Sequence, residues 1–284
     1  MFYTPIECYT DVLQFGFLPR FFIQNLRVQV HVLTHYDSSS IVRSKACCLL
    51  YNADLLRQPR PCFLKGDVFQ QASHYQKISV GGRGQAWFLE IAGLSAVLRS
   101  YQRGGLVAKL NRQSYLGIQP ENSRAFKEWR LLQWMFDRGL PVPQPVAASL
   151  SRWPFAFSPF YRAHILLLRL ENTQTLDQLL GQQAPDDRLW SLVGKCIRQF
   201  HNAGVCHADL NVNNILIDDQ LRVYLIDFDK SAVRTGALAQ VIKKDNLSRL
   251  KRSLRKQQGL AERYFFTQEN WLALVAAYEK AGGG

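Results

Sequence analysis

The arrangement of apolar and polar positions changes twice along the chain. Residues 1–43 show one regular feature, the alternation of Val28, Val30 and Val32, followed by a polar stretch. From residue 46 onward, short apolar runs are divided by glycine and asparagine, a pattern that favours the strands of an antiparallel sheet. The runs are CCLLYNADLL, KISV, AWFLEIAG, LSAVLRSY and LVAKL.

Residues 123–138 are predicted to form a helix, because their apolar side chains recur at helical spacing and Ser123 is placed to cap the N-terminus. The apolar positions are Phe126, Trp129, Leu132 and Phe136. Proline lacks a backbone donor and restricts the residue before it, so the helix must end before the prolines that follow. These are Pro141, Pro143 and Pro145.

After residue 170 the pattern becomes mainly helical. The tracts TLDQLL and DRLWSLVGKCIRQFHNAG read as helices, and Gly204 is placed to end the second one. Two short apolar runs, NILI and RVYLID, flank a turn at Asp218 and Asp219, and residues 236–281 are helical again. A sheet-rich half followed by a helix-rich half indicates an α+β protein of two lobes. We expect an extension of unknown role over 1–43, an N-lobe over 44–170 and a C-lobe over 171–284.

Composition narrows the class of protein. The chain has 284 residues, of which 47% are hydrophobic and 20% charged, which is a globular balance that excludes disorder and coiled coil. No apolar run is long enough to cross a bilayer. The six cysteines are scattered without a C-x-x-C pair, so we expect reduced intracellular thiols rather than a zinc site or a disulfide framework.

The net charge of +13 points to a polyanionic partner: nucleic acid, an anionic membrane surface or a phosphorylated substrate. Residues 243–256 concentrate this charge, beside leucines at helical spacing. The cations are Lys243, Lys244, Arg249, Lys251, Arg252, Arg255 and Lys256, and the leucines are Leu247, Leu250 and Leu254. Such a helix could meet anionic lipid headgroups, or bury its leucines in a C-lobe and solvate its charges. No nucleic-acid motif accompanies the charge, so no nucleic-acid partner is expected.

The string His207–Asn214, HADLNVNN, resembles the catalytic loop of protein-kinase-like enzymes, in which an Asp is followed five positions later by an Asn. Phosphoryl transfer needs a carboxylate near the attacking hydroxyl and oxygen ligands for Mg²⁺. Asp209 would accept the hydroxyl proton, while Asn214 and Asp227, the first residue of an Asp-Phe-Asp triplet, would hold the metal. Asp229, the last residue of that triplet, replaces the usual glycine and could add a ligand or cap a turn.

Three upstream features complete a kinase pattern. A glycine-rich turn with Gly82, Arg83 and Gly84 lies between two strand-like runs and would cradle phosphates, although a hairpin turn also needs glycines. Lys109 in LVAKL is placed on a following strand. Glu128 lies on the predicted helix, 128 − 109 = 19 residues later, and would pair with that lysine.

Several tracts, taken in order, resemble the 3-deoxy-D-manno-octulosonic acid (Kdo) kinase family of Gram-negative bacteria. They are GRGQAWFLE, SYQRGGLVAKL, RAFKEWRLL, GLPVPQPVAA, CHADLNVNNIL, LIDFDKS and DNLSRLKRS, and they span about residues 46–281. The resemblance implies a two-lobed protein-kinase-like fold with ATP and Mg²⁺ in the cleft. It also implies transfer of phosphate to the 4-hydroxyl of Kdo on a lipid A precursor, by a peripheral protein at the cytoplasmic side of the inner membrane.

Two other functions fit parts of the same pattern. One is a kinase for another sugar acceptor, such as a core heptose or an aminoglycoside. The other is a non-catalytic kinase-like module that binds lipid. A scaffold has no chemical need for Asp209, Asn214, Asp227 and Lys109 together, which favours an enzyme.

Overall fold

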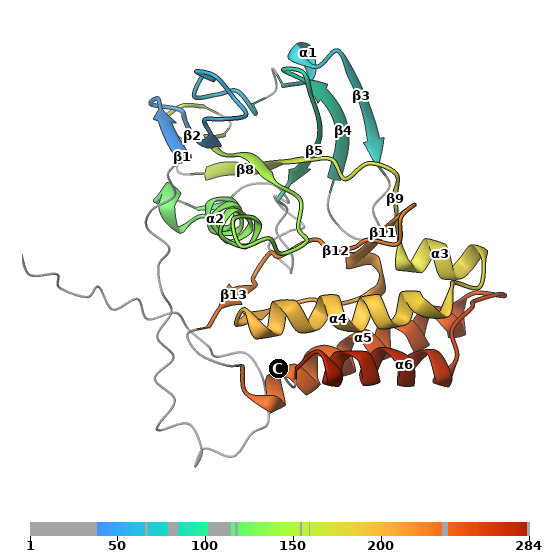
Figure 1. The fold of residues 1–284 in the computed structure, drawn as a ribbon. Helices are drawn as coiled ribbons and strands as arrows, with labels where there is room; N and C mark the ends of the chain where they lie inside the picture. The colour runs from blue at the N-terminus through green and yellow to red at the C-terminus, as the bar shows by residue number, and fades with distance from the viewer. Residues whose placement is uncertain are drawn as a thin grey trace, which may run out of the picture.

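The computed structural model describes most of the chain from residue 39 onward. The described residues are 39–65, 68–78, 85–101, 115–116, 119–153, 155–158, 160–234 and 238–282. Figure 1 shows two layers of structure: a sheet with helix α2 beneath it, and a group of helices at the carboxyl-terminal end of the chain. The predicted α+β fold with an antiparallel-sheet N-lobe and a mainly helical C-lobe is confirmed.

The N-lobe is built on an eight-stranded antiparallel sheet. Seven strands run in the order β1-β2-β7-β8-β5-β4-β3, and β6 pairs with β8. The strands are β1 (Ser39–Arg43), β2 (Cys47–Asn52), β3 (His74–Ile78), β4 (Gln85–Ile91), β5 (Leu94–Ser100), β6 (Tyr115–Leu116), β7 (Pro145–Arg152) and β8 (Phe160–Leu168). The sheet therefore begins inside the range expected for an extension, since β1 occupies residues 39–43, whereas residues 1–38 lie outside the described part.

Alternation along the strands gives this sheet two apolar faces. In β2, Leu49 belongs to a cluster beneath the segment 53–72, which includes α1 (Val68–Gln71). Its neighbour Leu50 belongs to the larger cluster on the other face, together with α2 and the C-lobe. Because successive side chains of a strand point to opposite faces, one strand serves both cores.

Helix α2 (Arg124–Phe136) follows the 3₁₀ turn η2 (Pro120–Asn122) and confirms the predicted helix. The Ser123 hydroxyl accepts the Phe126 N–H at 3.3 Å, as the cap predicts. Phe136 differs from the expectation, because it is partly exposed and Met135 takes the buried position instead. The buried face also carries one charged residue, Glu128, which points toward β5.

The C-lobe contains the following elements: β9 (Thr173–Thr175), α3 (Leu176–Gln182), α4 (Asp187–Asn202), β10 (Val205–Cys206), η3 (Val212–Asn214), β11 (Ile215–Asp218), β12 (Val223–Leu225), β13 (Ala232–Val233), α5 (Gln240–Leu260) and α6 (Gln268–Lys280). Strands β12, β11 and β9 form one small sheet, and β10 pairs with β13. Helices α4 and α6 touch closely at Gly194, where a Cβ atom would lie 2.2 Å from the Leu274 carbonyl oxygen. Gly204 ends α4 with a φ of +77°, a conformation that favours glycine.

The leucine stripe of the basic helix is used inside the protein. Leu247, Leu250 and Leu254 of α5 are buried in the core shared with α4 and α6. Of the two alternatives left open by the sequence, the structure shows the buried stripe, so α5 has no apolar face to insert into a bilayer. In the described part of the chain, no helix combines the length and apolar character needed to cross a membrane.

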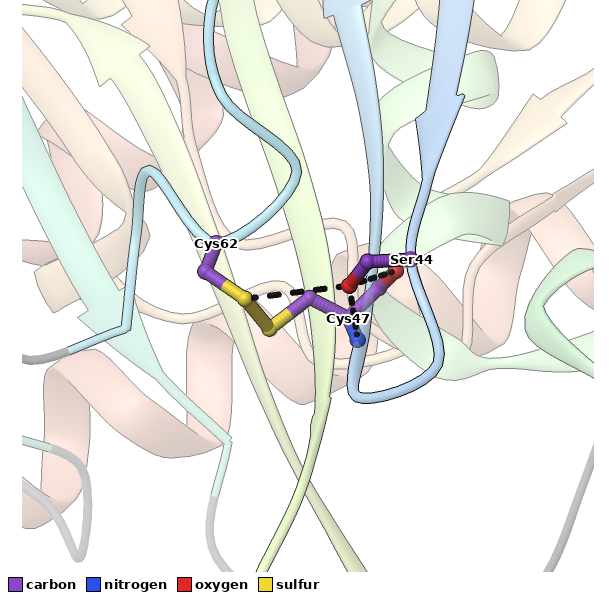
Figure 2. Close-up of a disulfide and its surroundings, with 3 residues drawn as sticks. All are labelled: Ser44, Cys47 and Cys62. Atoms are coloured by element: carbon purple, nitrogen blue, oxygen red, sulfur yellow. Dashed lines mark hydrogen bonds between the residues drawn. A yellow bond between two sulfur atoms is a disulfide. The ribbon is translucent and has the colours of Figure 1, made fainter. Parts of the chain in front are cut away.

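A disulfide joins Cys47 to Cys62 and corrects the expectation that all the cysteines are reduced thiols. Figure 2 shows the bridge beside Ser44, whose hydroxyl accepts the Cys47 N–H at 3.0 Å. The two cysteines meet because the segment after β2 folds back over the sheet. Neither the composition nor the spacing of the cysteines predicts that this segment brings Cys62 next to Cys47. Among the described residues, Cys48, Cys196 and Cys206 are free.

Candidate active site

His207 holds the predicted catalytic loop in place. Its Nε2–H donates to the Ile226 carbonyl at 2.8 Å, and its Nδ1 accepts the Asp209 N–H at 3.1 Å, which assigns the proton to Nε2. Burial lowers the pKa of His207, although the bond to Ile226 acts in the opposite direction. The ring is therefore neutral near pH 7 and links the loop to the strand end just before Asp227.

The two strings singled out in the sequence meet in space. The Asn214 amide donates to the Asp209 carbonyl at 2.8 Å. The Ile226 N–H donates to the Asn214 carbonyl at 3.1 Å. These bonds bring Asp209, Asn214 and Asp227 to one place at the surface of the C-lobe that faces the sheet. Because the Asn214 nitrogen is used by the loop, its oxygen is the atom suited to a ligand.

Asn246 of α5 supports the same loop, and no motif in the sequence pointed to this residue. Its amide nitrogen donates to the His207 carbonyl at 3.0 Å, while its oxygen accepts the His207 N–H and the His201 Nε2–H, each at 3.2 Å. Ser253, two turns further along α5, accepts the Val212 N–H at 3.3 Å. Helix α5 therefore holds the backbone of the predicted catalytic loop through two side chains, Asn246 and Ser253.

Asp227 begins the Asp-Phe-Asp triplet in an unusual backbone conformation. Its φ is +65°, a region that a non-glycine residue occupies at a cost and that is enriched at functional sites. Phe228 is fully buried, with its ring 4.6 Å from the His207 ring and 5.5 Å from the Phe200 ring, measured between centroids. Burying Phe228 in this way turns the Asp227 carboxylate toward the N-lobe.

Arg99 of β5 connects this carboxylate to helix α2. One guanidinium nitrogen donates to Asp227 Oδ1 at 2.7 Å and another to Glu128 Oε1 at 3.1 Å. Burial acts to lower the pKa of Arg99, but the charges of Glu128 and Asp227 outweigh burial and raise that pKa. The arginine is a permanent cation that bridges the lobes.

The sequence had assigned the partner of Glu128 to Lys109. Lys109 lies outside the described residues, as do Gly82, Arg83 and Gly84, so the structure does not place the predicted phosphate loop or that lysine. The sequence did not single out Arg99, because the tract LVAKL carries the lysine that the kinase pattern calls for. A signal was present: Arg99 and Tyr101 alternate with buried Ala96 and Leu98, which puts both on the opposite face of the strand.

Glu128 is held from two sides. Its side chain is only 1% exposed, and the Tyr101 hydroxyl donates to its second oxygen. Burial first, and then the charge of Glu128, raise the pKa of Tyr101, which therefore stays protonated as a donor. A buried carboxylate needs such partners, because an unpaired charge inside a protein is costly.

The second aspartate of the triplet also has a partner. Arg124, in the first turn of α2, donates from Nε to Asp229 Oδ1 at 2.8 Å and from a terminal nitrogen to the other oxygen. The same guanidinium lies 5.7 Å from the centroid of the Tyr101 ring. Asp229 therefore anchors α2 to the C-lobe, while its role as a metal ligand or turn cap stays a prediction.

The donor set suits a metal that is shared with phosphate. Within the described ranges, no three His, Cys, Asp or Glu side chains gather into a metal cage. Asn214 and Asp227 offer hard oxygen atoms from neighbouring backbone segments. Mg²⁺ is commonly held by one or two such protein ligands, with substrate phosphates and water completing its shell.

Comparisons with known proteins identify the family of this chain. The sequence model described as "Lipopolysaccharide kinase (Kdo/WaaP) family" matches residues 70–278. A 3-deoxy-D-manno-octulosonic acid kinase of Actinobacillus succinogenes is 36% identical over 247 residues, covering 84% of this chain and 98% of the relative. A protein with the same name from Haemophilus influenzae is 38% identical, over 77% of this chain and 92% of its own length. Another from Pasteurella multocida is 35% identical, over 84% of this chain and 98% of its own length.

Proposed function

Because the chain belongs to the lipopolysaccharide kinase (Kdo/WaaP) family, we propose that it transfers the γ-phosphoryl group of ATP to the 4-hydroxyl of Kdo on a lipid A precursor. The sugar oxygen forms the new bond to phosphorus, the bond to the β-phosphate oxygen breaks, and ADP leaves. The observation that carries the proposal is the meeting of Asp209, Asn214 and Asp227 opposite Arg99.

Asp209 accepts the proton of the attacking hydroxyl. Both of its backbone groups are bonded, the N–H to His207 and the carbonyl to Asn214, so the place of Asp209 in the loop is set before substrate arrives. Positioning of this kind is the main contribution a protein makes to phosphoryl transfer.

Asn214 Oδ1 and the Asp227 carboxylate are the Mg²⁺ ligands in this proposal. The ion supplies neutralisation of the charge on the phosphates when it is bound. Arg99 occupies only Oδ1 of Asp227, so Oδ2 retains its lone pairs for such a role. Gly82, Arg83 and Gly84 remain the predicted cradle for the nucleotide.

Arg99 takes the part that the sequence assigned to Lys109. It comes from the strand after β4, it is paired with the helix glutamate, and it faces the first aspartate of the triplet. Parallel assays of Arg99→Gln and Lys109→Gln distinguish the two residues: the first should lose about 10²-fold or more in kcat/KM, as when a transition-state donor is removed. If only Lys109→Gln were impaired, the assignment to Arg99 would be rejected.

The acceptor is tested with purified protein, labelled ATP and a panel of lipids and sugars. We expect transfer to Kdo-lipid IVA and none in the Asp209→Asn variant. Transfer only to heptosylated lipid A or to an aminoglycoside would reject the acceptor and keep the kinase. Lipid binding without any transfer would reject the enzyme in favour of a kinase-like lipid-binding module.

The protein works as a peripheral protein of the inner membrane, on the cytoplasmic side, in this proposal. Lys251, Arg252 and Arg255 of α5 would contribute by charge alone, because the leucines of this helix are buried. Each cation near an anionic leaflet contributes about 1 kcal/mol, so changing all three to Gln should weaken vesicle association by about two orders of magnitude. Sedimentation with vesicles at low salt measures this change, and unaltered binding would place the contact on another surface.

A further inference from the structure

The hairpin between β7 and β8 exposes several aromatic side chains at its tip. Phe155 is 51% exposed and Phe157 is 82% exposed, and their ring centroids lie 4.7 Å apart. Phe160 is also exposed, and Trp153 is partly exposed. Single exposed apolar residues are ordinary, but a protruding cluster of large aromatic ones marks a site of interaction.

Cations flank this cluster on both strands. Arg162 of β8 lies 4.1 Å from the centroid of the Trp153 ring. Arg152, the last residue of β7, donates to the Ser158 carbonyl at 2.7 Å and so holds the tip in its bent form. The hairpin therefore presents apolar rings at its end and positive charge at its base, with no carboxylate between Arg152 and Arg162 in the sequence.

A basic hollow adjoins the same hairpin. Its volume is about 490 Å³, and Arg152 and Tyr161 form the wall next to the aromatic tip. The lining residues that matter here are Arg43, Lys45, Arg152, Leu150 and Tyr161. Glu121 pairs with Arg43 at the rim. Three cations against one acid make the hollow suited to an anion such as a phosphate ester.

We propose that the tip of the β7–β8 hairpin and the adjoining basic hollow dock on an anionic phospholipid membrane. Aromatic side chains prefer the interfacial layer of a bilayer, where an apolar ring can be covered while polar neighbours stay wet. The flanking cations then lie at the depth of the lipid phosphates. Rings at the tip with cations behind them match the layers of a bilayer surface, in which the apolar region lies deeper than the lipid phosphates.

This inference rests on the proposed function, because a lipid-linked acceptor lies in a membrane that the enzyme must meet. The position of the hollow fits that need. Gln119 and Pro120, at the start of η2, also line the hollow, and η2 leads directly into α2, whose Arg124 holds Asp229. The docking surface and the triplet are therefore at the same end of α2. Figure 1 shows this helix lying between the sheet and the C-lobe.

The test compares Phe155→Ser/Phe157→Ser with a control, Leu272→Ser, which removes a side chain that is 57% exposed on α6. Binding is measured by sedimentation with vesicles of phosphatidylglycerol and phosphatidylcholine, and with phosphatidylcholine alone. We expect the double variant to bind the mixed vesicles about a hundredfold more weakly or worse, because two rings no longer enter the bilayer, and the control to bind normally. The intact protein should bind phosphatidylcholine alone at least about tenfold more weakly than the mixed vesicles.

Two further readouts separate this inference from the proposed function. Transfer to a water-soluble, deacylated Kdo acceptor should be unchanged in the double variant, while transfer to Kdo-lipid IVA in vesicles should fall with binding. Unchanged vesicle binding in a folded double variant overturns the inference. So does a change from dimer to monomer without lipid, measured by light scattering, which would make the tip a protein interface. Absence of transfer by the intact protein to either acceptor would refute the proposed function alone.

Discussion

Replacing Arg99 by Gln should destabilise the protein chiefly through Glu128. The Glu128 side chain is 1% exposed, and it would keep only the Tyr101 hydroxyl as a partner. Removing one member of a buried ion pair costs about 3–5 kcal/mol, and the remaining hydroxyl places our expectation near the lower value, about 3 kcal/mol. Asp227 adds little, because its side chain is 41% exposed and an exposed pair contributes about 0–1 kcal/mol.

A double-mutant cycle isolates this term. Glu128→Gln removes the buried charge, so Arg99→Gln made in that background should cost about 2 kcal/mol less than it does alone. Urea unfolding followed by circular dichroism gives the free energy of unfolding for each variant. The control is Arg43→Gln, which breaks an exposed pair with Glu121 and should change the free energy by less than about 1 kcal/mol. A coupling near zero, or equal losses for Arg99→Gln and the control, would refute the reasoning.

Three other predictions concern the catalytic loop and its support. Asp209→Asn should keep nucleotide binding, measured by calorimetry, and lose about 10²–10⁴-fold in turnover, so near-normal turnover would contradict its role as the base. Asn246→Ala should lower both kcat and the urea midpoint, because the His207 N–H and carbonyl lose their partners; unchanged values would remove Asn246 from the loop's support. Burial lowers the pKa of His201 from 6.5 to about 4, so unfolded chains bind more protons at this residue between these values, and His201 should contribute a loss of up to about 3 kcal/mol as pH drops from 6.5 toward 4. His201→Gln should make the profile less steep in urea titrations, with His164 keeping part of the slope, and an equally steep profile would contradict the assignment.

The parts of the site that are contiguous in sequence could be predicted. Asp209, Asn214 and Asp227 lie in two strings that their spacing marks and that the structure brings together, and the helix that carries Glu128 is marked by its cap and its apolar period. In each case, the local sequence contains both the side chain and the backbone that positions it.

The parts of the site that depend on tertiary contacts could not be predicted from the sequence. Asn246 lies 39 residues after His207 in a helix whose pattern shows only charge and leucine. Arg99 and Arg124 find their carboxylate partners because the sheet, α2 and the triplet meet, and an arginine in a sequence does not indicate which residue it will pair with. The leucines of α5 illustrate the same limit, since a buried helix and a membrane-surface helix share one period.

The contacts of Arg99 and Arg124 join the two lobes and still leave one carboxylate oxygen of Asp227 without an arginine partner. Arg99 takes one oxygen of Asp227 and one of Glu128, whereas Arg124 takes both oxygens of Asp229. The fully occupied aspartate is therefore the structural one, and the half-occupied Asp227, which is also the more exposed of the two, keeps an oxygen for a ligand. Because Arg124 begins α2 and Glu128 lies one turn later on the same helix, any shift of α2 moves both contacts together. The position of α2 therefore affects Arg99, the cation beside Asp227, through Glu128. A membrane contact near the N-terminal end of α2 would influence the candidate active site through this helix.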